Sequence, residues 1–193
     1  MTRISRGMAL AIAAMVGVVA LSNYVVQFEI ITTAVIGTVT WGAITYPATF
    51  FVTDLANRAF GPARARQVVY AGFAAGVALS LLLAPGRIAI ASGFAFLIGQ
   101  LLDVVVFDRL RRAPWWQAPF AGSVLGSIVD TVLFFGIAFV GVFPLLPAGT
   151  GPSVLSLIQG DLLIKLAFAL FFLAPFRALM GVVMPMTPAA AIR

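Results

Sequence analysis

Long runs with few or no charged residues divide the chain into six segments. They cover residues 7–28, 30–53, 67–86, 88–102, 113–147 and 153–176. A helix needs about 20 apolar residues to cross the hydrocarbon core of a membrane, and most of these runs approach that length. The pattern therefore predicts an all-α fold, a polytopic membrane bundle of six transmembrane helices in a single domain, 1–193.

The first run also has features of a signal peptide, because Arg3 and Arg6 precede an apolar stretch. Its apolar part is longer than the core of about 7–15 residues that signal peptides usually have. Asn23 and Gln27 are expected to extend the same helix. We therefore predict that the first run is retained as a membrane span.

Composition strengthens the membrane interpretation. The chain is 62% hydrophobic and 9% charged, whereas soluble domains carry about 25% charged residues. This excludes a soluble enzyme, a nucleic-acid-binding domain and a disordered chain. Cysteine and histidine are both absent, which removes disulfides, thiolate or histidine metal sites and Ser/His or Cys/His catalysis. We expect no cofactor and no metal.

The basic residues predict the orientation. With six alternating spans, ten of them fall on one side: Arg3, Arg6, Arg58, Arg64, Arg66, Arg109, Arg111, Arg112, Arg177 and Arg193. The opposite connections hold only Glu29 and Arg87, so the positive-inside rule places both termini in the cytoplasm. Trp115 and Trp116 fit an aromatic belt at the membrane interface, whereas Trp41 is expected deeper in the second span.

A few charged residues lie where lipid disfavours them. They are Asp103, Asp130, Asp161 and Lys165, with Asp54 at the inner end of the second run. A charge at mid-bilayer costs roughly 2.5–3.5 kcal/mol on the insertion scale, so such residues normally face a bundle interior and have a partner. These residues either form a buried ion-pair network that fixes helix packing or line a polar cavity. Their number favours the cavity.

Helical spacing groups these charges with amides and aromatic rings. The expected faces are Asn23 with Gln27, Gln100 with Asp103 and Phe107, Ser123 and Ser127 with Asp130 and Phe134, and Asp161 with Lys165. Carboxylates accept parallel N–H donors, amides both donate and accept, and aromatic rings stack. The sequence thus predicts a site for a flat, aromatic ligand with hydrogen-bonding edges.

Two features of the second run have alternative interpretations. Asp54 and Arg58 are spaced i, i+4, which fits either a salt bridge at a helix end or a gate. Tyr46-Pro47 predicts a helix kink, which either lines a cavity or serves packing alone.

Several short motifs occur together in a recognisable order. The first half contains residues 22–27, Thr40-Trp41-Gly42-Ala43 leading to Pro47, and Thr53-Asp54-Leu55 followed by Arg58 and Phe60-Gly61. The second half contains residues 99–107, Trp115-Trp116, Asp130-Thr131 followed by Phe134-Phe135, and Asp161 with Lys165. From about Asn23 to Lys165 the chain resembles the queuosine precursor transporter family, one of the vitamin-uptake-like small integral membrane transporters.

The resemblance implies a non-enzymatic importer in the cell inner membrane. Its substrates would be 7-cyano-7-deazaguanine and 7-aminomethyl-7-deazaguanine, the precursors of queuosine that are salvaged for tRNA modification. The implied substrate-binding residues are Asn23, Gln27, Trp41, Gln100, Asp103, Phe107, Asp130, Phe134, Asp161 and Lys165. The expected partners are this small molecule and the lipid bilayer, with no nucleic acid, and a homo-oligomer is possible.

Two other functions fit parts of the pattern. A substrate-binding subunit of an energy-coupling-factor transporter also has about six apolar helices, and it would need ATPase subunits as partners. A membrane-embedded lipid-modifying enzyme would need paired carboxylates to hold Mg²⁺. Asp103 and Asp130 lie on separate predicted helices without a clustered acidic motif, which disfavours the enzyme.

Overall fold

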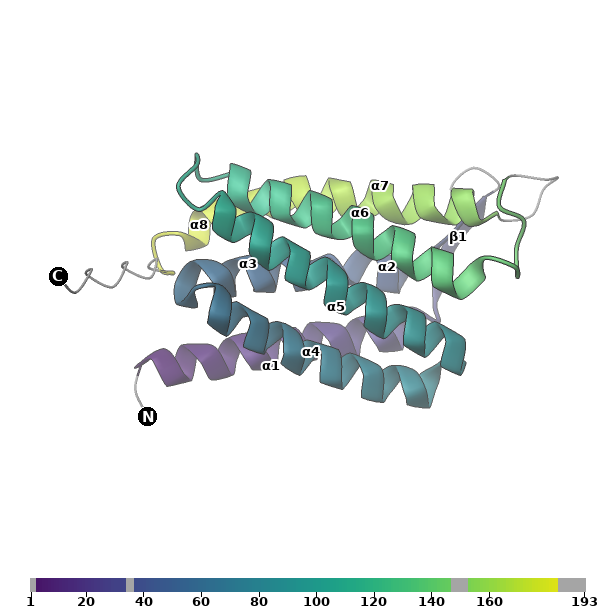
Figure 1. The fold of residues 1–193 in the computed structure, drawn as a ribbon, viewed down its shortest axis with the longest axis horizontal. Helices are drawn as coiled ribbons and strands as arrows, with labels where there is room; N and C mark the ends of the chain where they lie inside the picture. The colour runs from purple at the N-terminus through teal and green to yellow at the C-terminus, as the bar shows by residue number, and fades with distance from the viewer. Residues whose placement is uncertain (1–2, 34–36, 147–152, 184–193) are drawn as a thin grey trace.

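The computed structural model describes residues 3–33, 37–146 and 153–183. Its elements are α1 (Arg3–Val25), β1 (Glu29–Thr33), β2 (Gly37–Thr40), α2 (Trp41–Thr45), α3 (Ala48–Phe60), α4 (Pro62–Leu83), α5 (Gly86–Arg109), α6 (Gln117–Phe139), α7 (Val154–Phe171) and α8 (Leu173–Leu179). The long helices lie side by side in a bundle (Figure 1).

Within the described residues, five helical segments are long and apolar enough to cross a membrane. They are Arg6–Val25, Pro62–Leu83, Gly86–Arg109, Gln117–Phe139 and Val154–Leu179. These correspond to five of the six predicted spans and confirm the multi-pass membrane architecture. Helices α2 and α3, with 5 and 13 residues, are each too short to cross alone.

The prediction of a continuous helix over 30–53 is wrong. The first part of this run forms an antiparallel hairpin, in which Ile31 pairs with Val39 and Thr32 with Thr38. Isoleucine, valine and threonine dominate this stretch, and their branching at Cβ favours strands over helices. Apolarity alone therefore did not predict the secondary structure of this run, and β1 is mostly exposed.

The chain returns to helix directly after the hairpin. Thr40 caps α2, because its hydroxyl oxygen accepts a hydrogen bond from the Ala43 amide at 3.3 Å. The helical path then breaks at Tyr46 and Pro47 before α3 begins at Ala48. Proline has no amide hydrogen and cannot continue the hydrogen-bond ladder, so the predicted kink is confirmed.

The two ends of the bundle differ in charge. Figure 1 places the start of α1, the end of α3, the start of α4, the end of α5 and α8 at one end, and the hairpin at the other. The first end, called the basic end here, receives Arg6, Arg58, Arg64, Arg66, Arg109, Arg111, Arg112 and Arg177. Arg193 lies outside the described residues. The predicted clustering of arginines at one end is thus present.

The opposite end, called the hairpin end here, holds Arg87 in the first turn of α5. Its guanidinium group donates to the carbonyl oxygens of Ile137 and Val140, both at 2.7 Å. These carbonyls lie at the C-terminus of α6, where a positive charge is favourable. The arginine at this end therefore caps a neighbouring helix.

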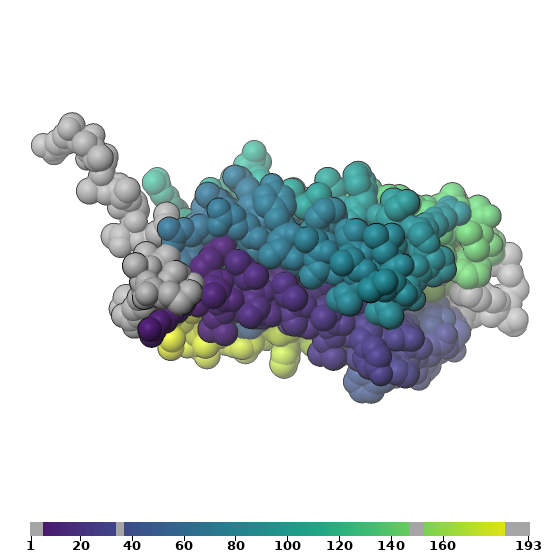
Figure 2. Space-filling model, turned by 90° about the horizontal axis from the view of Figure 1, so that it is seen from below, coloured from purple at the N-terminus to yellow at the C-terminus, as the bar shows by residue number. Residues whose placement is uncertain are grey.

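Helices α5 and α6 pack so closely that their backbones touch. A Cβ atom on Gly126 would lie 2.8 Å from the Gly99 carbonyl oxygen, and a Cβ atom on Gly99 would lie 2.9 Å from the Gly126 carbonyl oxygen. Gly122 and Gly126 form the G-x-x-x-G spacing that allows such contacts between membrane helices. On the other side of α5, helices α1 and α4 enclose a core that includes the fully buried Met15 and Val68, and Figure 2 shows α1 lying along α4 on the surface.

Candidate functional site

A buried lysine joins helices α6 and α7. The Lys165 ammonium on α7 lies 2.6 Å from a carboxylate oxygen of Asp130 on α6 and 2.6 Å from one of Asp161 on α7. It also donates to the Thr131 hydroxyl at 3.0 Å, and Thr131 donates to Asp161 at 2.6 Å. Lys165 is only 4% exposed. The predicted spacing thus brings Asp130, Asp161 and Lys165 together.

Tyr46, at the break between α2 and α3, completes this group. Its hydroxyl donates to the second carboxylate oxygen of Asp130 at 2.7 Å, and its ring lies 5.0 Å from the Lys165 nitrogen, within cation–π distance. Tyr46 was predicted only as part of a kink. We call Tyr46, Asp130, Thr131, Asp161 and Lys165 the lysine cluster. With two carboxylates and one ammonium it is a charged, hydrogen-bonded site inside the spans.

A second buried group lies nearer the basic end. Asp54 on α3 and Asp103 on α5 are 3% and 0% exposed. Ser123 on α6 donates to one oxygen of Asp54 at 3.1 Å. A Cβ atom on the preceding Gly122 would collide with a carboxylate oxygen of Asp103. Both carboxyl groups therefore converge on the same turn of α6, and we call them the carboxyl pair.

Most oxygens of the carboxyl pair lack a hydrogen-bond partner. Both oxygens of Asp103 and one oxygen of Asp54 are buried and have no hydrogen-bond partner among the described residues. Buried polar atoms in folded proteins nearly always have a partner. Asp103 therefore differs from Asp130, because both carboxylate oxygens of Asp130 accept hydrogen bonds.

Gln100 on α5 is hydrogen bonded to α3 between the lysine cluster and the carboxyl pair. Its amide nitrogen donates to the Thr49 hydroxyl at 2.8 Å, and its amide oxygen accepts from Thr53, the residue before Asp54. Thr49 in turn donates to the Tyr46 carbonyl at 2.8 Å. Thr49, Thr53 and Asn57 are spaced four residues apart, and this polar helix face is the sequence signal for the hydrogen bonds of Gln100.

Asp54 and Arg58 form no ion pair in the described part of the chain. Asp54 is buried in the middle of α3, not exposed at the helix end. The Arg58 guanidinium instead lies 6.0 Å from the Phe176 ring. Arg111 donates to the Asn57 side chain at 2.6 Å. The predicted helix-end salt bridge is therefore replaced by separate contacts.

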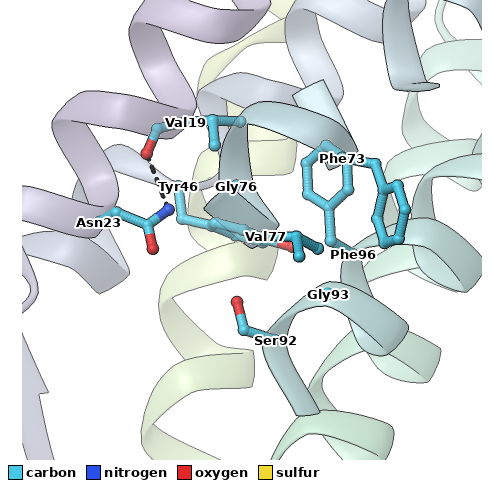
Figure 3. A pocket seen from close by; sticks show the side chains of 9 residues that line it. All are labelled: Val19, Asn23, Tyr46, Phe73, Gly76, Val77, Ser92, Gly93 and Phe96. Carbon is cyan, nitrogen blue, oxygen red and sulfur yellow. Dashed lines mark hydrogen bonds between the residues drawn. The ribbon is translucent and has the colours of Figure 1, made fainter. Parts of the chain in front are cut away.

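Asn23 belongs to a third polar contact, which borders a small pocket (Figure 3). Its amide donates to the Val19 carbonyl at 3.0 Å and accepts from Ser80 at 2.8 Å. Tyr46 and Ser92 also line the pocket. The interior volume is about 10 Å³, enough for about one water molecule. The bundle is therefore closed around its polar groups.

Four other predicted residues lie apart from these groups. Helix α1 ends at Val25, so Gln27 shares no helix face with Asn23, and its side chain is exposed. Trp41 is 51% exposed. Phe107 is buried against Phe176 at the basic end. Phe134 packs in an aromatic cluster on α6.

No group of three or more acidic, histidine or cysteine side chains suited to a metal ion occurs in the described residues. The carboxyl pair supplies two carboxylates only, and Lys165 already neutralises one charge of the lysine cluster. The arrangement fits hydrogen bonding and charge recognition.

Comparisons with known proteins agree with this architecture. A family model described as "Putative vitamin uptake transporter" matches residues 40–85 and 79–180. The "Queuosine precursor transporter" of Escherichia coli K12 is 38% identical over 146 residues, which cover 63% of this chain and 64% of that protein. The "Probable queuosine precursor transporter" of Haemophilus influenzae Rd is 37% identical, with 63% and 65% coverage, and that of Bacillus subtilis 168 is 30% identical, with 55% and 59% coverage.

The matched region thus spans just under two thirds of the length of these relatives. The family-model match, over residues 40–85 and 79–180, includes both the lysine cluster and the carboxyl pair. No solved structure gives a significant match. The five apolar spans and the family match together identify a multi-pass membrane protein, and the chain belongs to the vitamin uptake transporter family that includes the queuosine precursor transporters.

Proposed function

We propose that this chain imports 7-deazaguanine precursors of queuosine across the cell inner membrane. The substrates would be 7-cyano-7-deazaguanine and 7-aminomethyl-7-deazaguanine, and the mode would be secondary transport or facilitated diffusion. The observation that carries the proposal is the buried lysine cluster within the membrane spans of a chain whose relatives are named for queuosine precursors. Intramembrane ionisable residues usually mark a substrate or ion pathway.

The lysine cluster has the chemistry that a deazaguanine edge requires. The base carries a carbonyl acceptor beside two parallel donors, the ring N–H and the 2-amino group. Lys165 can donate to the carbonyl, and the carboxylate of Asp130 can accept both donors. Tyr46 supplies an aromatic face at the same place. We place the substrate here, with Asp161 and Thr131 holding the Lys165 ammonium in position.

The remaining candidates take lesser roles in this proposal. Gln100 and Asn23 border the same interior and can meet the ring edge once the bundle opens. Gln27, Trp41, Phe107 and Phe134 contact neither the lysine cluster nor the carboxyl pair in the described structure, so we assign them to the entry paths or to packing. Asp103 is treated separately below.

Transport requires the bundle to open and close around this site. The pocket beside Tyr46, about 10 Å³ in volume, is far too small for a bicyclic base. Access must therefore come from helix movement, alternately from each end. The break at Pro47 and the short helices α2 and α3 are the least regular part of the bundle, which favours them as the moving element.

We also propose the orientation and the sixth crossing. The arginines of the basic end support a cytoplasmic location for that end, and hence for both termini, by the positive-inside rule. Helices α2 and α3 together cover Trp41–Phe60 and lead from the hairpin end to the basic end (Figure 1). At 1.5 Å per residue, 20 residues extend about 30 Å, the thickness of the hydrocarbon core.

The test is uptake-dependent queuosine in tRNA, measured in a strain that cannot make or import the precursors. Wild-type protein should restore queuosine when the precursor is supplied. Asp130→Asn should reduce uptake by at least tenfold, because an amide cannot accept two parallel donors. Asp108→Asn changes an exposed aspartate on α5 and should leave uptake unchanged. Equal uptake by Asp130→Asn and wild type at matched membrane levels would overturn the site assignment.

Reconstitution separates a self-sufficient transporter from a subunit. Uptake of a labelled deazaguanine by proteoliposomes that contain only this chain is the expected result. Binding without uptake, together with co-purification of ATPase subunits from cells, would instead support the energy-coupling-factor alternative.

A further inference from the structure

We propose that the carboxyl pair, Asp54 and Asp103, binds the proton that drives import. This inference rests on the proposed function, because it assigns an energy source to the same transporter. In our proposal the substrate lies at the lysine cluster, and the carboxyl pair, with Asp103 among the predicted substrate-binding residues, is assigned to the proton instead. Its two carboxyl groups come from different helices, converge on Gly122 and Ser123, and leave three oxygens without a partner.

Two ionised carboxylates are not stable in this position. A buried charge without a counter-ion costs several kcal/mol, and two carboxylates that share a site repel each other, so one of them normally keeps a proton. In the described structure, neither Asp54 nor Asp103 has an ion-pair partner within 4 Å, whereas Asp130 and Asp161 both have Lys165. A bound proton is the simplest way to neutralise the carboxyl pair.

The nearby cations form no ion pair with Asp54 or Asp103 in the described structure. On α3, the Arg58 guanidinium lies 6.0 Å from the Phe176 ring, and its Nε has no hydrogen-bond partner there. After α5, Arg111 contacts Asp108 and Asn57. On α8, Arg177 lies 5.2 Å from the Trp115 ring. The turn of α6 that faces the carboxyl pair contributes Ser123, which is neutral.

The space around the carboxyl pair fits a proton better than a metal cation. A metal such as Ca²⁺ or Mg²⁺ needs about six to eight oxygen ligands, and the pair with Ser123 offers only five side-chain oxygens. Close packing also leaves no room for a hydrated ion, because even a Cβ atom on Gly122 would collide with Asp103. A proton needs only one oxygen that lacks a partner.

The carboxyl pair lies close enough to the lysine cluster for helix movement at the substrate site to displace it. Ser123 and Asp130 are seven residues apart on α6, about 10 Å at 1.5 Å per residue. On α5, a Cβ atom on Gly99 would lie 2.8 Å from the Cβ atom of Asp130. Asp103 lies one turn further along α5, toward the basic end. Gln100, between them, is hydrogen bonded to Thr49 and Thr53 on α3. A shift of α5 or α3 that admits substrate must therefore also disturb the carboxyl pair.

One proton per transport cycle is sufficient, because it is taken up on the outside and released on the inside. A carboxylate oxygen of the pair takes a proton from water while the transporter is open to the outside. The same O–H bond breaks on the inside, and the proton passes to water at the basic end. Asp103 is six residues from Arg109 at the end of α5, about 9 Å along the helix, so the exit path is short.

The experiment uses the purified full chain in proteoliposomes that enclose a pH-sensitive dye. A gradient of 7-deazaguanine is applied with no initial pH gradient, and potassium with valinomycin holds the membrane potential at zero. Wild-type vesicles should acidify inside as substrate enters. With an inward proton gradient of about one pH unit, substrate should accumulate up to about tenfold if one proton accompanies each molecule.

The variant Asp54→Asn should lose both the acidification and the accumulation, leaving an inside-to-outside ratio of about one, while Asp108→Asn should match wild type. Asp103→Asn is a second variant in case the first does not fold, and thermal stability in detergent reports folding for both. Substrate uptake by wild type without proton entry would overturn the proton proposal alone. Absence of any deazaguanine uptake by wild type would refute the proposed function and the coupling with it.

Discussion

Gly122→Ala tests the closest contact between α5 and α6. A Cβ atom at this position would overlap a carboxylate oxygen of Asp103 and would lie 3.3 Å from both the carboxyl carbon and the backbone oxygen of Asp103. Rotation of the Asp103 side chain would relieve the overlap with its carboxylate oxygen but not the close approach to its backbone oxygen. The substitution must therefore push the two helices apart or displace the carboxyl group.

The expected cost can be isolated with a matched control. Gly136 is on the same helix, and a Cβ atom there meets nothing within 4 Å. Both substitutions gain the same helix propensity, up to about 1 kcal/mol, so this gain cancels in the comparison. Overpacking costs about 1–3 kcal/mol, and Gly122→Ala should be less stable than Gly136→Ala by that amount.

The measurement is the free energy of unfolding in mixed micelles, followed by circular dichroism during denaturant titration. Asp103→Ala in the Gly122→Ala background removes the overlapping atoms and should recover most of the loss, giving a coupling energy of about 1–3 kcal/mol in the double-mutant cycle. Equal stability of the two single glycine variants, to within about 0.5 kcal/mol, would refute the tight α5–α6 contact.

Three further substitutions test other parts of the structure. Lys165→Met leaves the buried Asp130 and the partly buried Asp161 without their cation and should cost about 3–5 kcal/mol in unfolding free energy, whereas Leu163→Met, on an exposed position of the same helix, should change it by less than about 0.5 kcal/mol; similar values for both would contradict a charged cluster. Tyr46→Phe removes the hydrogen bond to Asp130 and should cost about 1.5–3 kcal/mol by the same titration, and an unchanged midpoint would show that this bond is absent. Gly37→Ala forces a side chain into the left-handed region at φ 64° and against a leucine of α7, so the melting temperature should fall by several degrees; an unaltered value would argue against the hairpin geometry.

The sequence predicted the positions of the membrane spans better than their secondary structure. Five apolar runs became membrane-length helices because apolarity over about 20 residues is itself what the bilayer selects. The run over 30–53 failed because apolar content does not distinguish helix from strand. Its β-branched residues carried the missing signal, and Gly37 marks where the second strand begins.

The candidate site was predicted in part. Spacing of four residues placed Asp161 beside Lys165, and the cost of a buried charge brought Asp130 to them. Tyr46 could not be predicted as their partner, because its hydroxyl reaches Asp130 across 84 positions of sequence. The separation of Asp103 from the lysine cluster also depends on tertiary packing, since α5 contacts α6 through glycines that fix which turns meet.

The hairpin determines how deep the protein sits in the membrane. Residues 29–32 of β1 are exposed, and exposed strand backbone needs water as its hydrogen-bond partner, because lipid offers none. The hairpin must therefore remain at the boundary between lipid and water, which places the half-exposed Trp41, directly after it, in the interfacial layer that tryptophan prefers. Trp115 and Trp116 are at the basic end, and we expect them in the matching interfacial layer on the other side of the membrane.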